Sequence, residues 1–147
     1  MRNLLLFLHL AGAIFWMGGM AFMVLSLRPA LGQLPPPARL PLVVEVLGRF
    51  FVVVTISIVL LLATGVFMLL DVPGGTPPAG WHAMAGLGIV MMLVFGHIFF
   101  GPWRRLKQAV AAQDWPAGGA RMNQIAMLVK VNLGLGWVAI AAVLLWR

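Results

Sequence analysis

The sequence predicts an all-α protein, a bundle of four transmembrane helices, and two features of the chain indicate it. Of the 147 residues, 63% are hydrophobic and 9% are charged, and the mean hydropathy is +1.05. A soluble globule needs more polar surface than this. Four stretches contain no Lys, Arg, Asp or Glu, and a helix that crosses a bilayer needs roughly 17–25 mainly apolar residues. These stretches are residues 3–27, 50–70, 82–103 and 131–146.

We expect a single integral membrane domain over residues 1–147, and its first span over residues 4–27. The apolar run there is long and contains Trp16, whereas a cleaved signal peptide has a short apolar core and a small-residue cleavage site. The second span is expected over residues 47–70. It follows the run Pro35-Pro36-Pro37, which cannot continue a preceding helix.

The third span is expected over residues 81–101, after a turn rich in Pro and Gly at residues 72–78. The fourth is expected over residues 122–146. Its uncharged part covers only 16 residues, so Lys130 is included in the span. We interpret Lys130 as an anchor whose stem extends toward the headgroups, with an internal cation as the alternative.

The distribution of basic residues predicts the orientation in the membrane. Arg2 and Arg147 lie at the chain ends, and the other eight lie in or beside the first and third connections. By the positive-inside rule, both termini and the 72–78 turn are expected on the non-cytoplasmic side. The eight are Arg28, Arg39, Arg49, Arg104, Arg105, Lys107, Arg121 and Lys130.

Composition also excludes several classes of function. The formal net charge of +7 comes from residues that border the spans, and no nucleic-acid recognition motif is present, so we expect contacts with membrane lipids and none with nucleic acid. The absence of cysteine excludes disulfides, thiolate metal sites and iron–sulfur clusters. The three acidic residues, Glu45, Asp71 and Asp114, lie outside the spans, so no carboxylate pair is available for acid–base catalysis within the membrane. An oxidoreductase whose cofactor supplies the chemistry stays open.

His9 is the residue that most constrains function, because it lies in an uninterrupted apolar helix. A neutral imidazole in hydrocarbon is costly unless its ring nitrogens have partners, and an intramembrane ionisable residue is first interpreted as part of a site. We expect its partner to be a metal, with iron in haem as the leading choice.

Small and aromatic residues accompany His9 on the same helical face. At about 100° per residue, His9, Trp16 and Met20 fall within roughly 40° of one line, bordered by Gly12 and Gly19. Such a stripe suits a flat cofactor lying against the helix, and it suits close helix packing equally well.

The third span carries His82 at one end and His97 fifteen residues later, roughly 22 Å along the axis, so the two cannot bind one iron. His82 is expected at the depth of His9, which predicts one site between the first and third spans. His97 offers a second site at the inner end. Hydrogen bonding to water, headgroups or a carbonyl is the alternative role for both residues.

The predicted cofactor is haem b, held by His9 and His82, in a protein with a redox or electron-transfer role. Copper is the alternative, since thioethers suit Cu(I). Ten methionines in an apolar chain more often serve as adaptable packing. Those that could form a copper path are Met17, Met20, Met23, Met84, Met91 and Met92.

Short motifs give the chain a family likeness. They are His9 followed by Trp16-Met17-Gly18-Gly19, then Gly80-Trp81-His82, Phe95-Gly96-His97, Trp103-Arg104-Arg105-Leu106 and Val131-Asn132-Leu133-Gly134. Together they resemble the CopD-domain family over nearly the whole chain. The resemblance implies a small multi-pass protein of the bacterial inner membrane, associated with copper handling and related to haem-binding four-helix proteins.

The pattern of His9, Trp16, Gly18 and Gly19 is also similar to the first helix of HemJ-type protoporphyrinogen oxidases, which implies porphyrinogen oxidation as a further alternative. The chain departs from that family elsewhere. It lacks the lysine that HemJ proteins carry near Trp81-His82, and it has Asn123-Gln124 where they carry Asn-Glu. As partners we expect a redox protein or a quinone, and a second copy of the chain through the large lipid-facing surface.

Overall fold

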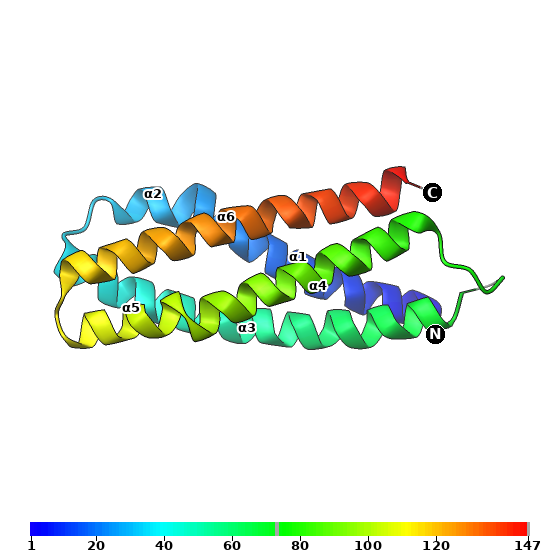
Figure 1. Ribbon diagram of the computed structural model, residues 1–147, viewed down its shortest axis with the longest axis horizontal. Coiled ribbons are helices and arrows are strands. Elements are labelled where there is room, and N and C mark those ends of the chain that lie inside the picture. Colours follow the sequence, from blue (N-terminus) through cyan, green and yellow to red (C-terminus); the bar gives the residue numbers. More distant parts are fainter. Residues whose placement is uncertain (73, 147) are drawn as a thin grey trace.

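The structure is a bundle of antiparallel helices, described in a computed structural model for residues 1–72 and 74–146 (Figure 1). Over these residues, four helical segments are long and apolar enough to cross a bilayer, and no strand occurs. The predicted fold class is therefore confirmed. The segments are Arg2–Leu31, Pro36–Leu70, Ala79–Ala111 and Trp115–Leu145.

The first segment comprises α1 (Arg2–Phe22), a π-helical turn, η1 (Met23–Leu27), and α2 (Arg28–Leu31). The second is α3 (Pro36–Leu70), which begins well before residue 47, where its start was expected. Proline is tolerated in the first turn of a helix, where its missing N–H is not needed. The proline run therefore ends one helix and also begins the next.

The third segment bends at Gly101, which separates α4 (Ala79–Phe100) from α5 (Pro102–Ala111). After a tight turn, the carboxylate of Asp114 accepts a hydrogen bond of 3.1 Å from the Ala117 N–H and caps α6 (Trp115–Leu145). This cap starts α6 about two turns earlier than residue 122.

The two ends of the bundle differ in what they carry. Both chain ends and the connection between α3 and α4 lie at one end, which we call the terminal end (Figure 1). The connections from α2 to α3 and from α5 to α6 lie at the other, which we call the basic end.

Within the bundle, α1 packs mainly on α3, and α4 packs mainly on α6. Gly12 allows the first contact, since a Cβ there would lie 3.3 Å from the Ser57 carbonyl oxygen of α3. In the second pair, the Gly80 N–H donates a hydrogen bond of 3.0 Å to the Trp146 carbonyl. Pairing therefore joins the first span with the second and the third with the fourth.

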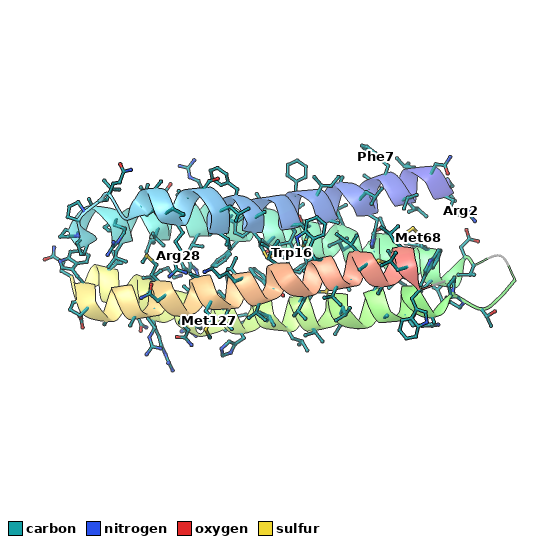
Figure 2. All side chains as sticks on the ribbon, turned by 90° about the horizontal axis from the view of Figure 1, so that it is seen from above. Arg2, Phe7, Trp16, Arg28, Met68 and Met127 are labelled. Atoms are coloured by element: carbon teal, nitrogen blue, oxygen red, sulfur yellow. The ribbon has the colours of Figure 1, made fainter. Side chains whose placement is uncertain are left out.

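Large apolar side chains cover the outside of the bundle. Ile14 and Leu93 are each 68% exposed, and Phe7 projects away from the helices while Trp16 lies among them (Figure 2). Exposed apolar surface on this scale marks contact with another apolar phase. For four apolar helices of spanning length, that phase is the hydrocarbon of a bilayer.

Candidate functional site

A cavity of about 240 Å³ lies in the half of the bundle near the terminal end. Its walls come from α1, α3, α4 and α6, and it runs from Trp81 to Met91, roughly 15 Å along the axis. The residues that line it include His9, Trp16, Met17, Gly65, Met68, Met84, Met91, Met92 and Gly136.

Among the described residues that line it, His9 is the only ionisable side chain, and Thr64 of α3 orients it. The distance from His9 Nδ1 to Thr64 Oγ1 is 2.8 Å, and Thr64 Oγ1 donates its one proton to the Leu60 carbonyl at 2.6 Å. Because that proton is committed to Leu60, Oγ1 can only accept from His9, which places the imidazole proton on Nδ1. In the neutral ring, Nε2 then carries the free lone pair.

Histidines that bind metals in proteins commonly have this arrangement of hydrogen bonds. A ligating histidine usually donates its other ring N–H to a fixed acceptor, which sets the tautomer and the ring orientation. No hydrogen bond to Nε2 comes from residues 1–72 or 74–146. The lone pair of Nε2 is therefore available to a ligand.

Gly65, next to Thr64, gives the imidazole its space. A Cβ at this position would lie 3.3 Å from His9 Cε1, a tight contact. Thr64 and Gly65 therefore act together, one holding the ring and the other admitting it.

Thioethers supply the other donors in the cavity. Met17 comes from α1, Met68 from α3, and Met84, Met91 and Met92 from α4. A Cβ on Gly136 of α6 would collide with the Met17 sulfur and lie 3.2 Å from the Met91 methyl group, so these two side chains meet at Gly136. The described residues that line the cavity therefore offer one imidazole and several soft sulfur atoms, and none of them is a carboxylate.

One turn before Gly136, Asn132 is 2% exposed and links α6 to α4. Its Nδ2 donates a hydrogen bond of 3.2 Å to the Met91 carbonyl, while its Oδ1 has no partner in the described part of the chain. This amide fixes the segment of α4 that carries Met91 and Met92.

The predicted site residues separate into those that line the cavity and those that do not. His9 and Trp16 line it, and Trp16 is 3% exposed. Met20 belongs to the buried core, and Gly12 serves the contact between α1 and α3. His82 and His97 are both exposed and lie outside the cavity lining.

Two structural points bear on ligand choice. The structure does not bring His82 to His9, although the neighbouring Trp81 and the nearby Met84 line the cavity. Over the described residues, no three His, Cys, Asp or Glu side chains gather in a way that could hold a metal ion. A metal here would therefore need thioether ligands beside His9.

Thr64, Gly65 and Gly136 were not predicted. Thr64 could have been predicted, because a hydroxyl within an apolar span needs a hydrogen-bond acceptor and can itself accept a hydrogen bond from another helix. The glycines carried none, since their role depends on which side chain lies opposite.

Comparison with known proteins gives the family. The model of the family described as copper resistance protein D matches residues 44–146. The chain belongs to this family.

The copper resistance protein D match covers α4, α5, α6 and most of α3, including Thr64 and Gly136, whereas His9 lies before the matched range. An uncharacterized protein of Aquifex aeolicus (strain VF5) is 32% identical over 138 residues, which cover 92% of this chain and 94% of that protein. No solved structure matches. Family membership and four spanning helices together make this a multi-pass membrane protein.

Proposed function

We propose that this protein binds monovalent copper within the bacterial inner membrane, with His9 Nε2 as the nitrogen ligand and cavity thioethers as the sulfur ligands. The observation that most directly supports this proposal is the pair of hydrogen bonds from His9 to Thr64 and from Thr64 to Leu60, which leaves Nε2 of His9 free.

The donor set supports copper in its reduced state. Thioether sulfur is a soft ligand that favours Cu(I), whereas Mg²⁺, Ca²⁺ and Mn²⁺ prefer oxygen ligands. The cavity lining offers no carboxylate, and the chain has no cysteine that would direct the choice to zinc thiolate sites. Membership of the copper resistance protein D family agrees with this choice.

The positions of the basic residues support an orientation. We propose that the basic end lies in the cytoplasm and that both chain ends lie on the opposite side, as the positive-inside rule predicts. The His9 cavity is then closer to the non-cytoplasmic surface.

A second candidate is haem b with an electron-transfer role. The cavity, at about 240 Å³, has room for a ligand much larger than a single metal ion. His9 and a methionine such as Met84, which both line the cavity, would hold the haem iron. Bound haem would supply one-electron chemistry, and the residues of this chain would hold it and exclude water.

Both candidates are tested on the full-length protein purified in detergent. Copper per chain is measured after equilibration with Cu(I) under reducing conditions, and an absorption spectrum is recorded on the sample as purified. We expect about one copper per chain, and we expect His9→Ala to weaken binding by more than the ~10–100-fold that loss of an outer-shell partner costs.

His82→Ala is the matched control, because it removes an exposed histidine outside the cavity. It is expected to leave copper binding unchanged. A Soret band that disappears in His9→Ala and persists in His82→Ala would favour haem instead. If His9→Ala binds copper as wild type does and no Soret band is present, both proposals are wrong.

A further inference from the structure

Three of the four helical segments carry arginine at the same level near the basic end. We call this group the arginine collar: Arg28 on α2, Arg104 and Arg105 on α5, and Arg121 on α6. It lies far from the His9 cavity, and none of its residues lines that cavity.

Contacts between helices establish the common level. Arg28 donates a hydrogen bond of 3.2 Å to Asn123, two residues from Arg121. On α3, a Cβ on Gly118 would meet Leu40, and Arg49 comes nine residues after Leu40, so Arg49 lies on the apolar side of this level.

The remaining link joins α5 to α6. A Cβ on Gly118 would lie 3.7 Å from Ala109 and 3.9 Å from Leu106. Because the two helices are antiparallel, three residues forward from Gly118 and a few residues back from Leu106 lead to the same height. Arg121 therefore lies level with Arg104.

The collar lies at the depth of lipid headgroups. Phe100 is 70% exposed and marks the last large apolar side chain on this face of α4. Arg104 follows four residues later, roughly 6 Å along the axis. The polar layer on each side of a bilayer is roughly 5–7 Å thick, so the guanidinium groups reach the phosphates while Phe100 stays in hydrocarbon.

The collar carries little acidic charge of its own. On α3, Glu45 pairs with Arg49, outside the collar, at 2.7 Å. Arg104 and Arg105 are exposed and have no acidic partner in the described part of the chain. Arg28 donates one hydrogen bond to the amide oxygen of Asn123, and Arg121 donates one to that of Gln124. Both guanidinium groups keep further N–H donors.

We propose that the arginine collar binds the phosphates of anionic phospholipids and thereby fixes the depth of the bundle in the membrane. A guanidinium group matches a phosphate with two parallel hydrogen bonds, and it keeps its charge at any physiological pH. Lys130 is exposed nine residues after Arg121 on α6, roughly 13 Å along the axis on the apolar side of the collar.

The test uses the full-length protein in nanodiscs of phosphatidylcholine doped with phosphatidylglycerol. Enrichment of phosphatidylglycerol around the protein is measured by native mass spectrometry of the lipids that remain bound on release. The variant Arg104→Gln with Arg105→Gln removes two exposed charges, and Arg2→Gln at the terminal end is the control. At about 1 kcal/mol per basic residue near an anionic surface, the double variant should lose roughly 10- to 30-fold of the preference for phosphatidylglycerol.

Lysine variants, a salt series and a soluble phosphate distinguish the effect of charge from recognition of the lipid itself. Arg104→Lys with Arg105→Lys should keep most of the preference, and raising the salt concentration should reduce it for the wild type. Equal retention of the two lipids by the wild type would overturn the proposal. So would an unchanged preference in the double glutamine variant. If millimolar glycerol 3-phosphate alone displaces the bound lipid, the site takes a free phosphate and the lipid assignment is wrong.

Discussion

At the scale of single residues, the hydroxyl of Thr64 decides the chemistry of His9. An imidazole in an apolar span has two nitrogens to satisfy, and it can use either as the donor. Thr64 removes that freedom, since its own proton is held by the Leu60 carbonyl at 2.6 Å. A hydroxyl on a neighbouring helix therefore fixes which nitrogen faces a ligand.

Replacing Thr64 should weaken metal binding without removing a ligand. We expect Thr64→Val, which keeps the shape and removes the hydroxyl, to lower copper affinity by about 10–100-fold, because the ring loses its fixed tautomer and orientation. Thr64→Ser retains the acceptor and should stay close to wild type. The measurement is competition for Cu(I) with a chromophoric chelator. Equal affinities for Thr64→Val and Thr64→Ser would contradict this role.

At the scale of the helices, close backbone contacts hold α4 against α6 at the terminal end. Gly80 lies against the carbonyl groups of Ala142 and Trp146, and its own N–H donates to the latter at 3.0 Å. A Cβ would collide with both oxygens. The next residue, Trp81, lines the His9 cavity, so this contact also positions a cavity wall.

The variant Gly80→Ala should therefore destabilise the protein. Backbone oxygens cannot rotate away as a flexible side chain can, and overpacking of this kind costs about 1–3 kcal/mol. Gly86→Ala, on the same helix with no atom near its Cβ position, should be neutral or stabilising by up to about 1 kcal/mol, since alanine favours helix. The measurement is thermal unfolding in detergent. A loss in Gly86→Ala as large as in Gly80→Ala would contradict this assignment.

At the scale of the whole molecule, the bundle is longer than a bilayer is thick. The α3 helix has 35 residues, about 52 Å, whereas the hydrocarbon layer is about 30 Å thick. If the arginine collar lies at headgroup depth, the excess length projects beyond the membrane at the basic end. The part of α5 after Arg105 and the first turns of α3 and α6 then lie beyond the headgroups.

Orientation can be tested directly because the chain has no cysteine. Thr76→Cys and Ala112→Cys place single thiols in exposed connections at opposite ends. An impermeant maleimide added to intact spheroplasts is expected to label Thr76→Cys at once, and Ala112→Cys only after permeabilisation. The reverse pattern would place the basic end outside the cytoplasm and overturn the positive-inside prediction.

The sequence by itself determined the fold class, because the bilayer imposes length and apolarity on every span whatever the partners are. It also predicted a site at His9, since a polar group in hydrocarbon is costly wherever the helix packs. The proline run at residues 35–37 showed a limit of such patterns, because residues that stop one helix can also start another.

Only the tertiary structure decided what surrounds His9. Apolar helices of similar length can pair in several ways, and the sequence predicted a site between the first and third spans. In the structure the first span pairs with the second, which brings Thr64 and Gly65 to the imidazole, while His82 lies on the exposed surface. The partner of a buried group depends on which helix faces it and in what rotation, and that follows from packing of the whole bundle.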